Sequence, residues 1–269
     1  MNRFGKGYRP DPPSRRTQKP SRHLLGSAPA IPPSATLESF EAPIMDQGQT
    51  GSCTGHGTAQ ALFTSYAAHG SVLPFVPSPA GIYTVTRVME RDINTTPLRD
   101  DGAMPSDVMA GISKWGIRPM GERPPDGRFS DVDPVTVNAE PSVFQLATDA
   151  LRLETGEYRI DMAESDWWDQ VCAAIATNCV VGIGVFVDTA FEDWDPAKGP
   201  MTSVNLSDPN GGGHWLALTS YDRSGSGMAR GPNSWGDSWG SGGHYEVSPD
   251  WLRASCSDCY VFNVRGWTS

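Results

Sequence analysis

The sequence predicts an α+β fold in which a mainly helical lobe packs against a mainly antiparallel sheet, with a cleft between the two. Helix-type patterns come first along the chain, and segments rich in β-branched and aromatic residues follow them. A length of 269 residues with 38% hydrophobic content is enough for one large domain, or two lobes, with a substantial core.

The spacing of apolar residues predicts three helices. Cys53 is followed by apolar residues at helical intervals and then by Gly70, a left-handed stop, so the first helix is expected over residues 53 to about 69. A second helix is expected around residues 105–114, and a third around residues 167–176 within "DWWDQVCAAIA". The first of these predictions places Cys53 in the first turn of its helix.

Four later segments have the composition of strands. Gly, Asp and Pro bound them, as expected where strands meet turns. They read "VVGIGVFV" (180–187), "HWLALTSY" (214–221), "GGHYEV" (242–247) and "CYVFNV" (259–264). Together they predict the antiparallel sheet of the second lobe.

The N-terminal end of the chain differs from the rest. Residues 1–36 are rich in Pro, Arg and Ser without a helical or strand period, so they are expected to form an extended basic arm, and residues 37–269 the folded domain. The whole chain has a net charge of -10 and a pI of about 4.9. This acidic balance argues against nucleic acid as a partner, because phosphate binding needs clustered Lys and Arg.

No segment is long and apolar enough to span a bilayer, and the arm lacks the apolar core of a secretory signal. These features favour a cytoplasmic or virion-associated location over secretion. An odd number of five cysteines in a long chain does not form a dense disulfide framework, so at least one thiol is expected to be free.

Cys53 carries the first indication of chemistry. The sequence "DQGQTGSCTGHGTAQALF" puts this thiol at a helix start, where unsatisfied amides and the helix dipole favour the thiolate. The alternative is that Cys53 is a small buried residue without a reactive role. A nucleophilic cysteine also needs a base, a group that orients the base, and donors for the oxyanion. His214, Asn233 and Gln47 are candidates for these roles.

These residues resemble the site of the papain-like cysteine peptidases. In that family Gln, Cys, His and Asn follow one another in this order, within the same short motifs. The matching segments are Gln47-Gly48, Gly51-Ser52-Cys53, Gly213-His214 and Asn233-Ser234-Trp235-Gly236, and the resemblance covers roughly residues 32 to 265. It implies a two-lobe papain-like fold with the active site in the cleft, and peptide hydrolysis without a cofactor or metal.

The resemblance also implies a role for each residue. Cys53 would be the nucleophile, His214 the base and then acid, and Asn233 the group that orients the imidazole. The side-chain amide of Gln47 and the backbone amide of Cys53 would bind the oxyanion. Trp235 would cover the Asn233–His214 hydrogen bond, and Gly102, Gly213 and Trp235 would contact the substrate.

The sequence departs from the eukaryotic members of the family in two ways. Thr50 and Thr54 stand where those members have a cysteine and a tryptophan, which excludes one of their disulfides and points to the bacterial and viral branches. Only about 40 residues precede the predicted core, too few for the long helical pro-domain of the family. The arm is expected to dock onto an assembly partner or, as a second possibility, to block the cleft.

Other residues have competing interpretations. His56, three residues after Cys53, is an alternative base, and His244 is expected to be solvent-facing or structural. Cys256 and Cys259 have metal-ligand spacing without a second pair, so a zinc site, a disulfide and free thiols stay open. The remaining two cysteines, Cys172 and Cys179, are expected in the core.

The residues favour a cysteine endopeptidase that acts on a peptide or protein substrate through a thioester acyl-enzyme. Two alternatives stay open. One is a papain-fold component of a phage or secretion assembly, whose activity is lost or secondary and whose arm binds the assembly. The other is a thiol amidase acting on cell-wall peptides.

Overall fold

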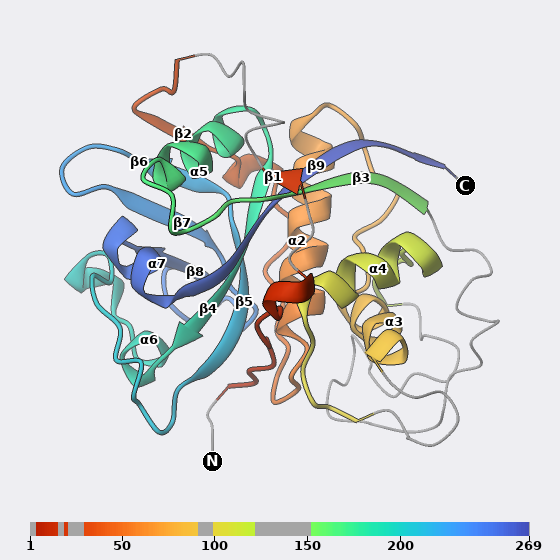
Figure 1. Cartoon of the computed structure of the whole chain (residues 1–269), viewed down its shortest axis with the longest axis horizontal. Helices are drawn as coiled ribbons and strands as arrows, with labels where there is room; N and C mark the ends of the chain where they lie inside the picture. Colours follow the sequence, from red (N-terminus) through yellow and green to blue (C-terminus); the bar gives the residue numbers. More distant parts are fainter. Residues whose placement is uncertain (1–3, 16–18, 21–29, 91–98, 122–151, 269) are drawn as a thin grey trace.

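A computed structural model describes residues 4–15, 19–20, 30–90, 99–121 and 152–268 of the chain. Helices α3 and α4 lie on one side of the central helix α2, and most strands lie on the other side (Figure 1). The helices are α2 (Cys53–Ala68), α3 (Pro79–Glu90), α4 (Pro105–Trp115), α5 (Trp167–Ala176), α6 (Thr189–Glu192) and α7 (Pro249–Ser255), with short 3-10 turns at Pro13–Arg15, Glu38–Phe40 and Pro196–Lys198.

The strands form two sheets. The larger sheet has the order β1-β3-β9-β4-β5, and the smaller one has the order β2-β6-β7-β8. All neighbours are antiparallel except β1 and β3. The strands are β1 (Lys19–Pro20), β2 (Ser34–Thr36), β3 (Arg152–Arg159), β4 (Val180–Val187), β5 (Gly212–Leu218), β6 (Ser220–Asp222), β7 (Met228–Pro232), β8 (His244–Val247) and β9 (Cys256–Thr268).

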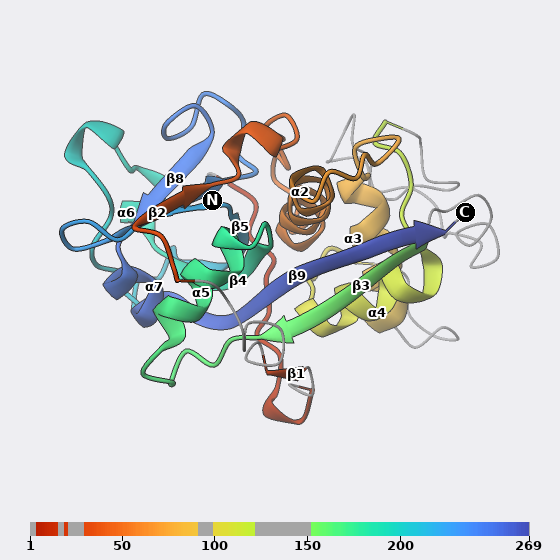
Figure 2. The ribbon, with the colours of Figure 1, turned by 90° about the horizontal axis from the view of Figure 1, so that it is seen from above.

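The three predicted helices are confirmed as α2, α4 and α5, and the predicted strands as β4, β5 with β6, β8 and β9. Strand β3 was not predicted, because its sequence "RLETGEYR" is too polar for a buried strand. Pairing with β9 makes this segment a strand, since the two are antiparallel partners from Arg152↔Thr268 to Arg159↔Tyr260. Figure 2 shows this long pair running past α3 and α4 towards the C-terminus.

Helix α2 lies at the centre of the molecule and is buried along almost its whole length. Its glycines permit this position. A Cβ on Gly57 would lie 2.7 Å from Cδ1 of Trp215 on β5, and a Cβ on Gly55 would lie 2.3 Å from the carbonyl oxygen of Pro79 on α3. The low helix propensity of glycine is therefore offset by close packing on both sides of the helix.

The N-terminal residues lie against the folded body. Strand β2, just before Leu37, pairs with β6 at the edge of the smaller sheet. Tyr8 and Asp11 are buried, with 5% and 1% of their surface exposed. Whether residues 37–269 fold without the arm stays a prediction.

The membrane prediction concerns the described residues only. Among their helices, none combines the length and the hydropathy that crossing a bilayer requires.

Candidate active site

Cys53 is the first residue of α2 and has 0% exposure. The backbone amides of Trp215, Gly7, Thr54 and Tyr8 each act to lower the pKa of its thiol. Burial nevertheless outweighs these donors and raises the pKa of the Cys53 thiol to about 11. The thiolate expected at a helix start is therefore disfavoured in this arrangement, where residues of the N-terminal arm cover the sulfur.

His214 and Asn233 form a hydrogen-bonded pair on the facing sheet lobe. His214 lies on β5, Asn233 follows β7, and the imidazole Nε2 is 2.8 Å from the Asn233 Oδ1. The same oxygen accepts the backbone N–H of Ser234 at 2.8 Å, which supports its assignment as oxygen. A carbonyl oxygen only accepts, so Nε2 carries a proton.

The environment keeps the imidazole neutral. Burial lowers the pKa of His214 to about 4; the hydrogen bond with Asn233 opposes this shift, while electrostatic interactions with Lys6 and His56 add to it. With Nε2 protonated, Nδ1 of the neutral ring is an acceptor, and it has no hydrogen-bond partner among the described residues. The ring therefore holds an unused lone pair suited to receive a proton.

Trp235 covers the His214 ring. The two ring centroids are 4.7 Å apart with an interplanar angle of 26°. Trp235 is 3% exposed, so its indole is buried beside the imidazole. The role predicted for Trp235, to cover the Asn233–His214 hydrogen bond, stays a prediction that its stacking on His214 allows.

Gln47 contacts the segment that follows β7 and carries Asn233 and Ser234. Its backbone N–H donates to the Ser234 carbonyl at 2.9 Å, and its Oε1 accepts the Ser234 hydroxyl. Its Nε2 donates to the carbonyl of Thr50 at 2.7 Å and to that of Gly5 at 3.1 Å. The side-chain amide predicted to bind an oxyanion thus already binds a carbonyl oxygen of the N-terminal arm.

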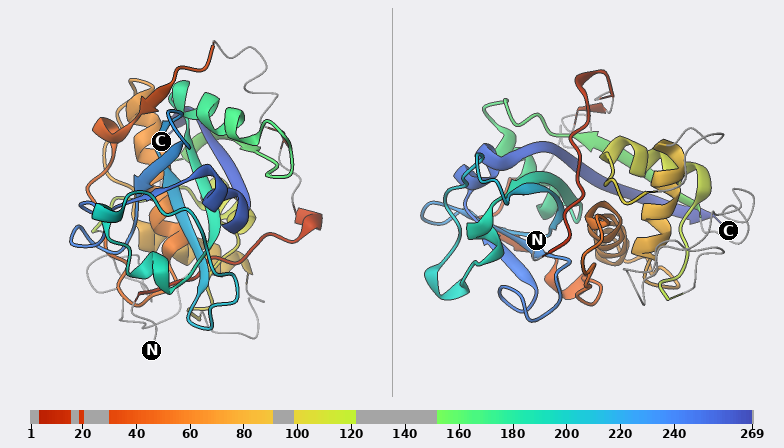
Figure 3. Two further views of the ribbon diagram at one scale, coloured as in Figure 1. Left: turned by 90° about the vertical axis from the view of Figure 1, so that its left-hand side faces the viewer. Right: turned by 90° about the horizontal axis from the view of Figure 1, so that it is seen from below.

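Residues 4–11, called here the arm segment, pass between α2 and the strands (Figure 3). Main-chain hydrogen bonds join the segment to both sides of the site. They run from Gly5 N to Gly48 O (3.0 Å), from Ala103 N to Gly7 O (2.7 Å), from Tyr8 N to Gly213 O (3.1 Å) and from Arg9 N to Ala103 O (2.9 Å). The segment is therefore held as an extended strand across Cys53.

Two glycines let this strand approach so closely. A Cβ on Gly5 would lie 2.1 Å from the carbonyl oxygen of Thr50, and a Cβ on Gly7 would lie 1.9 Å from that of Gly51. Backbone atoms cannot move away as a flexible side chain can. Any other residue at position 5 or 7 would therefore displace the arm segment.

The three residues predicted to bind substrate all contact the arm segment. Gly213 accepts the Tyr8 amide, and Trp235 Nε1 donates to the Gly5 carbonyl at 3.3 Å. Gly102, with φ of +72°, has no room for a Cβ, which would lie 2.1 Å from the Gly7 carbonyl oxygen. The backbone of the chain itself thus lies where the sequence placed the substrate.

Side chains of the arm segment also anchor it. Phe4 stacks on Trp235, with centroids 4.4 Å apart and planes 8° apart. Lys6 forms an ion pair with Glu192 and donates to the Asn210 carbonyl at 2.7 Å.

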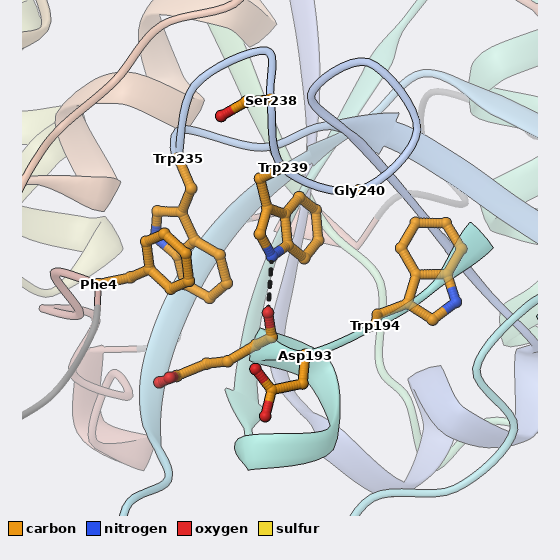
Figure 4. Close-up of a pocket in the computed structure, with 8 residues that line it drawn as sticks. Phe4, Asp193, Trp194, Trp235, Ser238, Trp239 and Gly240 are labelled. Carbon is orange, nitrogen blue, oxygen red and sulfur yellow. Dashed lines mark hydrogen bonds between the residues drawn. The ribbon is translucent and has the colours of Figure 1, made fainter.

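A cavity of ≈ 300 Å³ opens next to Phe4. Figure 4 shows three tryptophans around it, and the dashed line marks the hydrogen bond from Trp239 Nε1 to the Glu192 carbonyl, 3.0 Å long. The lining residues are Phe4, Glu192, Asp193, Trp194, Trp235, Ser238, Trp239 and Gly240. The cavity adjoins the covered site and combines aromatic walls with two acidic side chains.

The alternative histidines have structural contacts. His56 Nδ1 is 3.0 Å from the Ser52 carbonyl oxygen, one turn earlier in the chain. His244 is 8% exposed and its Nε2 is 2.7 Å from Glu41 Oε2, so the prediction that it faces solvent is wrong and its structural reading holds. His244 is the first residue of β8, a strand in which both neighbouring positions His244 and Tyr245 are buried.

All five cysteines are free thiols, and Cys172 and Cys179 are buried in the core as expected. Cys256 and Cys259 therefore form no disulfide here. No group of three potential metal ligands occurs among the described residues. Burial raises the pKa of Cys172 to about 12 and that of Cys179 to about 11, which makes both thiols poor nucleophiles.

The sequence did not reveal the side chains of the arm segment as part of the site. The available signal was "FGKGYRPD", in which two glycines flank a lysine next to two aromatic residues in an otherwise Pro-rich arm. Asp258, which accepts a hydrogen bond from the Tyr8 hydroxyl, was also not predicted as part of the site, because it lies within the "CSDC" segment considered for metal binding.

No family model matches the chain. An uncharacterized peptidase C1-like protein of Acanthamoeba polyphaga mimivirus is 23% identical over 208 residues, which cover 76% of this chain and 63% of that protein, less than two thirds of its length.

Solved structures resemble the whole described fold. Xylellain, a cysteine protease from Xylella fastidiosa, has a TM-score of 0.72 and 24% identity over 98% of both chains. Digestive procathepsin L2 of Tenebrio molitor has a TM-score of 0.69 and 19% identity over 99% of this chain and 79% of that one. Procathepsin B of Trypanosoma congolense has a TM-score of 0.65 and 14% identity over 98% of this chain and 88% of that one. The chain therefore has the fold of the papain-like cysteine proteases.

Proposed function

We propose that this chain is a cysteine peptidase with Cys53 as its nucleophile and His214 as its base. The observation that carries the proposal is the 2.8 Å pair of His214 and Asn233, stacked under Trp235. The Cys53 thiol lies beside the amide of Trp215, the residue after His214. A buried thiol together with an oriented imidazole that has an open acceptor supplies the groups that thiol catalysis needs.

The proposed reaction has two steps. His214 Nδ1 takes the thiol proton as the sulfur attacks the scissile carbonyl, and Gln47 Nε2 together with the Cys53 amide binds the resulting oxyanion. The C–N bond then breaks, His214 gives its proton to the leaving amine, and a thioester remains on Cys53. His214 then deprotonates a water molecule that attacks the thioester, the C–S bond breaks, and His214 returns the proton to the Cys53 sulfur as the acid product leaves.

We further propose that the arm segment keeps the peptidase latent. It occupies the amide of Gln47, covers Cys53, and fills the positions beside Gly102 and Gly213. These contacts favour the blocking role of the arm over the docking role that ranked first on sequence grounds. Docking to an assembly partner stays a separate prediction about the same residues.

The test uses the full chain carrying Gly7→Ala, which displaces the arm segment because the new Cβ would lie 1.9 Å from the Gly51 carbonyl oxygen. An epoxide thiol inhibitor should label Cys53 much faster than the other four cysteines, as read by mass spectrometry of peptides. Cleavage of a denatured protein substrate should disappear on adding Cys53→Ser and persist with Cys172→Ser, the matched control. Equal labelling of all five thiols, or cleavage that survives Cys53→Ser, would refute the proposal.

A further inference from the structure

The Tyr8 side chain occupies a site built by the body of the protein. Its ring lies against Gly184 on β4, Gly213 on β5 and the indole of Trp215, whose centroid is 6.0 Å away. Tyr8 is 5% exposed, so the site encloses almost the whole residue. Gly184, Gly213, Trp215 and Asp258 are called here the Tyr8 site.

Asp258 closes the far end of this site. Its Oδ2 accepts the Tyr8 hydroxyl at 2.6 Å and the backbone N–H of Asp11 at 2.9 Å. Asp258 is 0% exposed. Both donors come from the arm segment, so displacing the arm removes two hydrogen bonds from a buried carboxylate, which costs free energy until new donors replace them.

Gly184 gives the ring its space. A Cβ at this position would lie 2.2 Å from Cζ of Tyr8, far closer than van der Waals contact allows. The room for an aromatic side chain therefore belongs to the sheet and persists when the arm leaves. A site that has a glycine against the ring, an indole beside it and a carboxylate at its end matches the shape and the single donor of a phenol.

The Tyr8 site also lies next to the proposed nucleophile. The backbone of Tyr8 hydrogen-bonds to Gly213, the residue before His214, and its amide lies near the Cys53 sulfur. A peptide whose side chain enters this site therefore passes its backbone over the reacting thiol.

We infer that the Tyr8 site selects a tyrosine side chain of the peptide substrate and that Asp258 is the specificity-determining residue. The inference rests on the proposed peptidase function of Cys53. Tyrosine restores the hydrogen bond that Asp258 loses with the arm. Phenylalanine fills the same volume but leaves the carboxylate without that donor, and sites built to bind a hydroxyl discriminate against analogues that lack it.

The experiment compares peptide substrates with the full chain carrying Gly7→Ala. A library that varies one position at a time should show one position where kcat/KM for Tyr exceeds that for Phe by about tenfold or more. Asp258→Asn should reduce this ratio several-fold, because a charge-assisted bond becomes a neutral one. Asp250→Asn, at an exposed position on α7, makes the same charge change and should leave the ratio unaltered.

Gly184→Ala provides a second, independent variant. It fills the ring space and should lower kcat/KM for both Tyr and Phe at that position, while substrates with Ala there keep their rate. Equal rates for Tyr and Phe at every position would overturn the inference. A preference for Arg or Lys over Tyr at the position sensitive to Asp258→Asn would overturn the assignment of tyrosine.

A readout without catalysis keeps the inference separate from the proposed function. In the full parent chain, Tyr8→Phe should raise the hydrogen-exchange rate of the arm-segment amides by about tenfold, since the arm is then the ligand that lacks the hydroxyl. The same substitution in an Asp258→Asn background should have a smaller effect. Unchanged exchange in Tyr8→Phe would overturn the role of Asp258 even if peptide cleavage proved absent for other reasons.

Discussion

The carbonyl oxygen of Gly5 accepts a hydrogen bond from the side-chain amide of Gln47, 3.1 Å away. Trp235 Nε1 donates to the same oxygen at 3.3 Å. A carbonyl of the protein's own N-terminus thus occupies the donor that the proposed mechanism reserves for the oxyanion. The arm and the proposed oxyanion therefore compete for the Gln47 side-chain amide, so substitutions in the arm and in the site should both change the rate of the proposed reaction.

Gly5→Ala should open the site. The added Cβ would lie 2.1 Å from the carbonyl oxygen of Thr50, so the arm segment has to move away from Gln47. The rate at which an epoxide labels Cys53 should rise by at least about tenfold over the parent, as expected when a buried thiol becomes accessible. Ser14→Ala, at an exposed position of the same arm, is the control and should label like the parent. Parental labelling of Gly5→Ala would contradict the blocking role.

Gln47→Ala should reduce turnover when the arm is already displaced. The comparison needs the Gly7→Ala background, because in the parent the loss of Gln47 also loosens the arm. Removal of one oxyanion donor typically lowers kcat by about 10²–10³-fold. Gln49→Ala, two residues away and exposed, is the matched control. A Gln47→Ala variant that folds and turns over within a few-fold of its background would exclude Gln47 from the site.

His214 and His56 should separate in the same background. His214→Ala removes the proton acceptor and should lower kcat by about 10³-fold or more, as deletion of a member of a catalytic unit does. His56→Ala removes the contacts of Nδ1 with Ser52 and should act mainly on stability, which thermal unfolding measures. An inactive His56→Ala with an active His214→Ala would reverse the assignment of the base.

The sequence predicted the body of the fold from composition, since α2, α4, α5 and the strands of the second half have local patterns strong enough to locate them. The motifs also brought Gln47, His214 and Asn233 together before any coordinates. Two features depended on tertiary contacts. Strand β3 has a polar sequence and forms a strand by pairing with β9. The arm has no strand-like alternation of apolar residues, because its extended path is fixed by hydrogen bonds to the backbone on both sides of the site.

The sequence argument for an activated thiol was incomplete for the same reason. A helix start favours a thiolate, but the dipole acts alongside burial, and the arm segment decides how buried Cys53 is. The thiol pKa of about 11 belongs to the covered state. Local sequence identifies the candidate nucleophile, whereas the burial that raises its pKa involves a segment more than 40 residues away along the chain.

Acid should promote release of the arm segment through His214. Burial lowers its pKa from 6.5 to about 4 in the covered state, and exposure on release should return the pKa towards its ordinary value. Between these two values the open state binds a proton that the covered state excludes. The contribution of neutral His214 to the covered state is therefore complete above pH 6.5 and is lost as the pH falls towards 4.

Hydrogen exchange of the amides of Gly5, Tyr8 and Arg9, which donate to the site, measures this release once each rate is divided by its intrinsic value. The opening constant should rise by up to about tenfold per pH unit as the pH falls below 6.5, since one proton is taken up. Asp11 acts in the opposite sense, because burial raises its pKa and protonation then favours the covered state, so Asp11→Asn should steepen the profile. His214→Gln should flatten it. A profile independent of pH in the parent, or one that His214→Gln leaves intact, would show that another group controls the arm.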